Sequence, residues 1–154
     1  MLPFIKKIIM KGKRYLKAGI GYGGACFPKD TKSLLWQAKE HNYELLTVGA
    51  TIDVNDKQKS ILMKKAKKYY NTFNNLNIAI LGTTFKPGTD DLRESPSLSN
   101  ISLLVNDGAN IKVYDPISLK AMKNLYGDKI SYCDSVEEAL KDADICFIYR
   151  VGFY

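Results

Sequence analysis

The second half of the chain alternates between short apolar runs and stretches with helical periodicity. Residues 78–82, 111–116 and 145–149 are brief runs dominated by apolar side chains, which is typical of strands buried in a parallel sheet. Strands that alternate with helices predict an α/β fold with a Rossmann-like parallel sheet of the doubly wound type. Because the chain stops soon after the third run, we expect only part of such a sheet.

Capping residues mark the helices between these runs. Ser95 can act as an N-cap, and Pro96 takes the first helical position, where its missing N–H group costs nothing. Gly108 is expected to end this helix. A Ser-x-x-Glu capping box at residues 135–138 opens a second, shorter helix. The apolar face of the first helix is predicted to consist of Leu98, Ile101, Leu104 and Val105.

Two further helices are predicted in the first half of the chain. Thr31 can cap a helix that runs to Asn42 and carries apolar side chains on one side. A longer helix is predicted from Glu44 to Tyr70. A polar break at residues 71–75 then separates these helices from the first strand.

These patterns divide the chain into three parts. Residues 1–30 form a glycine-rich loop, residues 31–75 a helical segment and residues 76–154 a truncated Rossmann-like domain. The expected fold class is therefore α/β, with a helical middle segment followed by a partial Rossmann-like parallel sheet.

Composition is that of an ordinary globular protein. The chain has 154 residues, of which 45% are apolar and 25% charged. No apolar run approaches the ~18 residues that a membrane span needs, and the start is too short and too rich in lysine for a signal peptide. Three cysteines without a CxxC pair argue against a disulfide framework, so we expect a cytoplasmic protein without a membrane partner. The single histidine, His41, is interpreted as a solvated helix end, which leaves too few ligands for a Cys/His metal site.

The net charge of +7 has three possible explanations. Lysines gather between Lys57 and Lys68, which favours the solvated face of an amphipathic helix. A nucleic-acid surface is the alternative, because a basic face can neutralise phosphates, but no nucleic-acid motif accompanies it and we expect no such partner. Thirdly, the basic residues of the N-terminal third could face a small phosphorylated ligand.

The glycine-rich loop leads into a candidate nucleophile. Gly19, Gly21 and Gly24 satisfy G-x-G-x-x-G, but no buried strand precedes them, so they make a weak dinucleotide signal. Cys26 lies between this loop, a lysine and a helix N-terminus, where a thiolate is favoured over a thiol. Asp30 could act as a base or orient a water molecule. The alternative for any cysteine is a buried structural role, which we assign to Cys133 and Cys146.

A second candidate segment follows the first strand of the sheet. Residues 85–96 contain Lys86 and Arg93, cations that suit a phosphate or a ribose hydroxyl at the carboxyl end of a parallel strand. The alternative is a solvated, charged turn. Asp115 ends the second strand and could accept a ribose hydroxyl or cap the turn at Pro116.

Together, residues 19–30 (GIGYGGACFPKD) and 85–96 (FKPGTDDLRESP) resemble the UDP-glucose 6-dehydrogenase family of nucleotide-sugar dehydrogenases. Two long motifs in order make the resemblance specific, and it covers roughly residues 12–148. Family members combine an NAD-binding Rossmann domain, a helical middle with a long dimerisation helix, and a Rossmann-like domain for the nucleotide sugar. The resemblance therefore implies a homodimer with NAD as cofactor and UDP-glucose or a related nucleotide sugar as substrate.

The resemblance also implies a mechanism. The C6 alcohol of the sugar is oxidised to a carboxylate in two NAD-dependent steps. Cys26 matches the nucleophile, which forms a thiohemiacetal and then a thioester, and Asp30 matches the aspartate that assists the water and the cysteine. Cofactor contacts are implied at Lys29 and Arg93. Substrate contacts are implied at Tyr15, Leu16, Lys17, Ala18, Gly19, Gly23 and Lys86.

The chain departs from the family pattern at both ends. The nucleotide-binding glycine fingerprint after a first strand and the upstream catalytic residues are missing, and residues 1–11 and 149–154 are interpreted as unrelated. We therefore expect a C-terminal fragment that is inactive alone and leaves apolar surface exposed around Leu34 and Trp36. The alternatives are a non-catalytic fragment that binds a nucleotide sugar or dimerises, and a piece of a related UDP-N-acetylmannosamine or GDP-mannose dehydrogenase.

Overall fold

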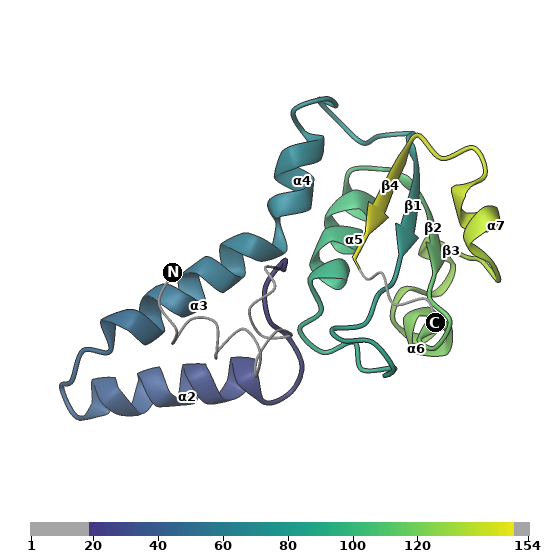
Figure 1. Ribbon diagram of the computed structural model, residues 1–154. Helices are drawn as coiled ribbons and strands as arrows, with labels where there is room; N and C mark the ends of the chain where they lie inside the picture. The colour runs from purple at the N-terminus through teal and green to yellow at the C-terminus, as the bar shows by residue number, and fades with distance from the viewer. Residues whose placement is uncertain (1–18, 150–154) are drawn as a thin grey trace, which may run out of the picture.

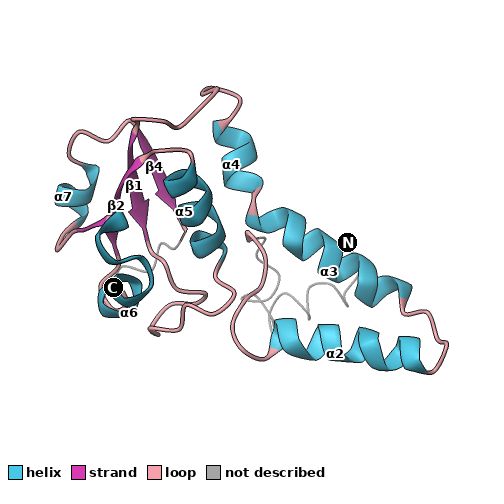
Figure 2. Cartoon of the chain, turned by 180° about the vertical axis from the view of Figure 1, so that it is seen from behind, coloured by secondary structure: helices cyan, strands magenta, loops and turns pink. Residues whose placement is uncertain are grey.

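Two long helices lie side by side at one end of the molecule, and a parallel sheet with its own helices lies at the other (Figure 1). This computed structural model describes residues 19–149. Helix α2 (Phe27–Glu40) and helix α3 (Leu46–Lys59) form an antiparallel hairpin, and the short helix α4 (Ile61–Ala66) connects it to the sheet. The same division is clear from behind (Figure 2). None of the helices within residues 19–149 is long and apolar enough to cross a membrane.

Helix α2 begins five residues earlier than predicted. Cys26 is its N-cap and Pro28 lies in its first turn, where a fixed φ and a missing N–H group favour a helix start. Thr31 is therefore not a cap. It lies inside the helix, and its hydroxyl donates to the carbonyl oxygens of Phe27 and Pro28 at 2.8 and 3.1 Å. His41 is the exposed C-cap residue, as predicted.

The single long helix predicted from Glu44 to Tyr70 is wrong, because it is interrupted at Ser60. The Ser60 hydroxyl donates to the Lys57 carbonyl at 3.1 Å, and the Lys59 carbonyl accepts the side-chain amide of Asn100 at 2.9 Å. These bonds replace the regular helical ladder at this point, and α4 starts after the break. The lysines after the break, Lys64, Lys65, Lys67 and Lys68, are exposed, as the solvated-face interpretation predicts.

The sheet has four parallel strands in the order β3-β2-β1-β4. The three predicted strands are confirmed as β1 (Asn77–Leu81), β2 (Asn110–Tyr114) and β4 (Ile145–Ile148). Ile78 of β1 pairs with Ile111 of β2 and Ile145 of β4. Parallel strands joined through helices confirm the Rossmann-like α/β class.

Additional elements lie between β2 and β4. The sequence predicted one helix there, and the structure has α6 (Leu119–Tyr126), a 3₁₀ turn (Gly127–Lys129), strand β3 (Ser131–Tyr132) and α7 (Val136–Leu140). The capping box is half confirmed: the Ser135 hydroxyl accepts the Glu138 N–H at 3.1 Å, but Glu138 accepts the N–H of Asp134. Helix α5 (Pro96–Asn106) follows Ser95 as predicted, and Gly108 beyond its end has a φ of +84°.

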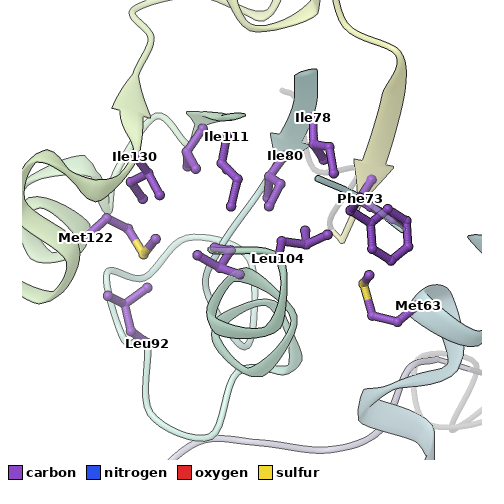
Figure 3. Packing of buried hydrophobic residues seen from close by; sticks show 12 residues of the cluster. Met63, Phe73, Ile78, Ile80, Leu92, Leu104, Ile111, Met122 and Ile130 are labelled. Atoms are coloured by element: carbon purple, nitrogen blue, oxygen red, sulfur yellow. The ribbon is translucent and has the colours of Figure 1, made fainter. Parts of the chain in front are cut away.

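Alternate side chains of the strands build a core on each face of the sheet. Ile78 and Ile80 of β1 point toward Leu104 of α5 and Met122 of α6 (Figure 3). Met63 of α4 belongs to the same cluster. The opposite face packs Leu81, Cys133 and Ala139 together. Each fully buried aliphatic side chain contributes about 1.5–3 kcal/mol, so this domain supplies most of the apolar stabilisation within residues 19–149.

Candidate functional site

The two motifs that are far apart in the sequence meet in space. The Gly24 N–H donates to the Arg93 carbonyl at 2.9 Å. A Cβ atom on Gly23 would lie 2.5 Å from the Glu94 carbonyl oxygen, and one on Gly24 would lie 2.7 Å from the Phe85 ring. Gly23 is therefore required because the two backbones approach so closely, and Gly24 because it has a φ of +84° and lies against the Phe85 ring. Residues 19–30 and 85–96 form one loop cluster.

Cys26 lies exposed at the start of α2, on the edge of this loop cluster. Phe27 is also exposed, and its ring packs edge-on against Tyr22 with a centroid distance of 5.0 Å. Arg93 is close enough for charge on Cys26 to affect it. The pKa of Arg93 is raised mainly by its hydrogen bond to Asp91, and also by the electrostatic effect of Cys26. Cys26 lies two residues after Gly24, whose N–H binds the Arg93 carbonyl, so the cysteine and Arg93 are held in the same part of the loop cluster.

Asp30 lies one helical turn after Cys26. Its N–H donates to the Cys26 carbonyl at 2.8 Å, so the two side chains project from the same side of α2. The Asp30 carboxylate lies 3.2 Å from the Lys29 ammonium, and both side chains are mostly exposed. The structure therefore provides a carboxylate and a cation beside the cysteine, both open to a ligand.

Arg93 is held in place by Asp91. Its Nε and Nη2 atoms donate to the two carboxylate oxygens at 2.8 and 2.7 Å, and its backbone N–H donates to the same carboxylate. The hydrogen bond from Arg93 lowers the pKa of Asp91 to about 2. Lys86, in contrast, makes a cation–π contact with Phe85, with its Nζ atom 5.1 Å from the ring centroid. These two cations differ in how firmly they are oriented.

Asp115 has a structural role. It is 4% exposed and accepts hydrogen bonds from the backbone N–H groups of Thr83, Ile117 and Ser118 at 2.7–3.0 Å. Burial by itself would raise its pKa, but the hydrogen bonds from Ile117, Thr83 and Ser118 outweigh it, so the pKa lies below its usual value. Of the two interpretations left open by the sequence, capping of the turn is the one that the geometry fits.

The remaining cysteines are far from equivalent. Cys133 is buried, as predicted, and burial raises its pKa. Cys146 is exposed, so the prediction of a buried structural cysteine is wrong for it. The reason is that β4 is an edge strand whose alternate side chains, including Ile148, face outward.

Three substrate positions implied by the resemblance, Gly19, Gly23 and Lys86, fall in the loop cluster. Gly23 packs against Glu94, and the Gly19 carbonyl accepts the Gln58 side-chain amide at 3.4 Å. The other four loop positions, Tyr15, Leu16, Lys17 and Ala18, lie outside the described residues. Within residues 19–149, no three histidine, cysteine or carboxylate side chains come together as a metal site would require.

Three side chains that support the loop cluster were missed by sequence reasoning. Asn55 contacts Tyr22, and Lys59 forms an ion pair with Glu94 at 2.6 Å. The sequence pattern places Lys59 among the solvated lysines between Lys57 and Lys68, but its side chain is only 15% exposed. No local signal distinguishes it from its neighbours, because its partner is 35 residues away.

Comparison with known proteins places these loops in a family. Residues 5–57 match the central domain of the UDP-glucose/GDP-mannose dehydrogenase family, and residues 79–151 match the UDP binding domain of the same family. The chain belongs to this family. Because the matches include residues 5–11 and 149–151, the interpretation of both ends as wholly unrelated is wrong at those positions.

Individual relatives are UDP-glucose 6-dehydrogenases. The chain is 39% identical to TuaD and 42% identical to YwqF, both UDP-glucose 6-dehydrogenases of Bacillus subtilis. Each alignment covers 89% of this chain but only 30% and 31% of the respective relative. The chain thus spans about a third of the length of the curated relatives it matches.

Solved structures agree on the fold. A UDP-glucose dehydrogenase from Pyrobaculum islandicum superposes with a TM-score of 0.86 at 28% identity, covering 95% of this chain and 34% of that chain. A GDP-mannose dehydrogenase from Pseudomonas aeruginosa superposes with a TM-score of 0.77 at 22% identity, covering 97% of this chain and 37% of that chain, which shows the shared fold alone.

Proposed function

We propose that this chain provides the cysteine-bearing loop and the nucleotide-sugar-binding domain of an NAD-dependent UDP-sugar 6-dehydrogenase, with UDP-glucose as substrate. The observation that carries the proposal is the contact between the two motifs, Gly24 N–H to Arg93 carbonyl at 2.9 Å. It allows one ligand to contact both the exposed cysteine and the cations after β1. We propose that the chain has three parts: the catalytic glycine-rich loop (residues 1–30), a helical dimerisation segment (residues 31–75) and a truncated Rossmann-like domain that binds the UDP-sugar (residues 76–154).

The nucleotide sugar is proposed to bind at the carboxyl ends of the strands. In open parallel sheets, ligands bind in the crevice at this edge, and the loop that carries Lys86 follows β1 there. Lys86 is exposed, and its ammonium, which lies over the Phe85 ring and helps to lower the pKa of Asp91, is accessible to a diphosphate. Gly19 and Gly23, with Tyr15, Leu16, Lys17 and Ala18, are proposed to complete the substrate contacts.

Cys26 is proposed as the nucleophile. Once an external hydride acceptor has oxidised the C6 alcohol of the sugar to an aldehyde, the Cys26 sulfur adds to that aldehyde. An S–C bond forms while the proton of the thiol passes to the carbonyl oxygen, which becomes a hydroxyl. After this thiohemiacetal has been oxidised by an external hydride acceptor, water attacks the resulting thioester and the thiol is released. Asp30 lies one turn away and is proposed to take the proton from the attacking water.

The described residues do not make a complete NAD site. Strand β1 is followed by Gly82, Thr83 and Thr84, so the Gly-x-Gly turn that would cradle a dinucleotide pyrophosphate is missing at that strand end. Lys29 and Arg93 are exposed cations that are proposed to contact the edge of the cofactor.

A homodimer is proposed through the helical hairpin. Leu46 and Val54 of α3 are 69% and 59% exposed, and Leu34 and Trp36 of α2 are 49% and 62% exposed. Such apolar side chains on one substructure favour association. The free thiols fit a reducing compartment, and we propose a cytoplasmic location.

Calorimetric titration of the chain with UDP-glucose tests the proposal. Binding is expected, and Lys86→Ala should weaken it about tenfold, the effect of one charge-assisted contact to phosphate. Lys68→Ala removes an exposed lysine that follows α4, outside the loop cluster, and is the matched control. Titrations with GDP-mannose and UDP-N-acetylmannosamine identify the preferred nucleotide sugar. A folded chain that binds none of them would contradict the proposal.

A mixture of the chain, UDP-glucose and NAD tests whether the chain is inactive alone. No NADH should form, because residues 19–149 lack a complete cofactor site. NADH formation by the purified chain would contradict the expectation that the chain is inactive alone.

A further inference from the structure

Asn55 is a buried polar side chain that the proposed chemistry does not use. It is 5% exposed, and it is the one buried residue of α3. Its Oδ1 atom accepts the Tyr22 N–H at 2.7 Å, and its Nδ2 atom donates to the Tyr22 carbonyl at 3.3 Å. One side-chain amide therefore satisfies both backbone polar groups of a loop residue, which requires a donor and an acceptor on the same group.

Gly21 makes room for this contact. Its φ is +105°, a conformation that side chains disfavour, and a Cβ atom there would lie 2.7 Å from Oδ1 of Asn55. An alanine at this position would strain the backbone and displace the amide. The glycine and the asparagine thus act together as a clamp on Tyr22, four residues before Cys26.

The same helix also holds the second motif. Lys59 lies one turn after Asn55, and its Nζ atom is 2.6 Å from Oε2 of Glu94 and 3.5 Å from Oδ1 of Asp56. Glu94 itself has a φ of +54°, so its backbone is held in a strained conformation. Helix α3 therefore grips both loops of the cluster, one through Asn55 and one through Lys59.

These contacts link α3 and the two loops in a closed series of interactions. Asn55 holds Tyr22, the Gly24 N–H binds the Arg93 carbonyl, and the adjacent Glu94 returns to Lys59. The loop that carries Cys26 is fixed on one side by α3 and on the other by the Arg93 peptide. Without the α3 side, one backbone hydrogen bond joins the glycine loop to the second motif within residues 19–149.

We propose that Asn55 is a positioning residue, which holds Cys26 beside Arg93 by clamping the backbone of Tyr22. The inference rests on the proposed function only in taking Cys26 as the reacting group. The inference concerns the position of the Cys26 sulfur relative to Arg93, which can be measured without substrate or cofactor.

The rates at which two alkylating reagents modify Cys26 report its position relative to Arg93. Iodoacetate is anionic and iodoacetamide is neutral, so a cation beside the thiol favours the first relative to the second. Mass spectrometry of the digested chain gives separate rates for Cys26 and for the exposed Cys146 of β4. The iodoacetate-to-iodoacetamide rate ratio at Cys26, divided by that at Cys146, is expected to fall about two- to threefold in Asn55→Ala, the size of one exposed charge interaction. An unchanged normalised ratio overturns the proposal.

Further variants separate positioning from folding. Thr51→Ala removes an exposed side chain of α3 that bonds only within the helix, and it should leave the ratio unchanged. Gly21→Ala should lower the ratio as Asn55→Ala does. Arg93→Gln should also lower it, and adding Asn55→Ala to Arg93→Gln should have no further effect. A further fall in that double variant would show that Asn55 acts by another route and would overturn the proposal.

A conservative variant tests the hydrogen bonds themselves. Asn55→Asp keeps an acceptor for the Tyr22 N–H but loses the donor to its carbonyl, so the ratio should fall less than in Asn55→Ala. A fall as large as or larger than that of Asn55→Ala contradicts the clamp. Because none of these readouts uses UDP-glucose, a failure to bind the sugar would refute the proposed function and leave this inference standing, and the reverse also holds.

Discussion

The helical hairpin and the sheet domain are stabilised in different ways. Helices α2 and α3 have 14 residues each, and each buries a single residue, Pro28 and Asn55. In the sheet domain Ile80, Leu104 and Met122 are completely buried. The hairpin carries the candidate nucleophile, but its position relative to the sheet depends on a few polar contacts. The reactive group therefore lies on the weaker region and is located by hydrogen bonds to the stronger one.

Core truncation should separate the two regions most strongly. Leu104→Ala is expected to destabilise the sheet domain by about 2–5 kcal/mol, since it leaves a cavity in a fully buried cluster. Leu34→Ala, in the hairpin, should change stability by less than about 0.5 kcal/mol, because this side chain is half exposed. Urea unfolding followed by circular dichroism measures both, and the single tryptophan, Trp36, reports the hairpin separately. Equal losses in the two variants would contradict the distinction.

Asp115 should make the sheet domain sensitive to acid. Its folded pKa is lowered, so it contributes stability above its unfolded pKa of about 4, and that contribution is lost as the pH falls through the folded value. Asp115→Asn should cost about 1–3 kcal/mol at neutral pH, because an amide cannot accept all the N–H groups that the carboxylate accepts. Urea unfolding between pH 2 and 7 gives both quantities. A variant with the same loss of stability below about pH 4 as the wild type would argue against this role.

The ion pair between hairpin and sheet domain should contribute less. Burial tends to lower the pKa of Lys59, but Glu94 and Asp56 outweigh it and the pKa is raised, while the hydrogen bond from Lys59 lowers the pKa of Glu94. The pair is therefore formed at neutral pH and is lost as the pH falls through the folded pKa of Glu94. A double-mutant cycle of Lys59→Met and Glu94→Gln should give a coupling of about 1 kcal/mol or less, since Glu94 is 40% exposed. A coupling of zero would remove Lys59 from the loop support.

Surface changes on the hairpin should have the smallest effect on folding but a visible effect on assembly. Leu46→Gln with Val54→Gln replaces two exposed apolar side chains of α3 and should leave the urea midpoint of the sheet domain unchanged. If the hairpin forms the dimer interface, sedimentation velocity will show a shift from dimer to monomer. A wild-type chain that sediments as a monomer at high concentration would refute the proposed dimer. The control is Lys64→Gln with Lys68→Gln, which changes one lysine in α4 and one just after it. If this control also shifts the chain from dimer to monomer, the loss of the dimer is not specific to the hairpin.

The sequence predicted the elements whose signal is local. Continuous apolar runs identify β1, β2 and β4, and the Ser95-Pro96 pair identifies the start of α5. Strand β3 has two residues, too few for a periodic pattern. Helix α6 does carry apolar residues at helical spacing, Leu119, Met122 and Tyr126, a local signal that the sequence prediction missed. The break at Ser60 depends on Asn100, whose amide reaches the Lys59 carbonyl from 41 residues away.

The candidate site divides in the same way. Cys26, Asp30, Lys86 and Arg93 were predicted from two motifs, since their residue types and spacing are local properties. The meeting of the motifs at Gly24 and Arg93 is a tertiary contact, as is the reach of Asn55 to Tyr22 across 33 residues. Neither follows from a pattern along the chain, so the supporting residues could be found only in the folded structure.

Protection of Cys26 by UDP-glucose tests most directly whether the two motifs bind one ligand. The chain is treated with iodoacetamide at increasing concentrations of UDP-glucose, and the rates at Cys26 and Cys146 are measured on the same sample. We predict that the rate at Cys26 falls with the occupancy measured by calorimetry, while the rate at Cys146 on β4 stays constant. Full occupancy by UDP-glucose with an unchanged rate at Cys26 would show that the cysteine and the nucleotide site are separate, and would contradict the account.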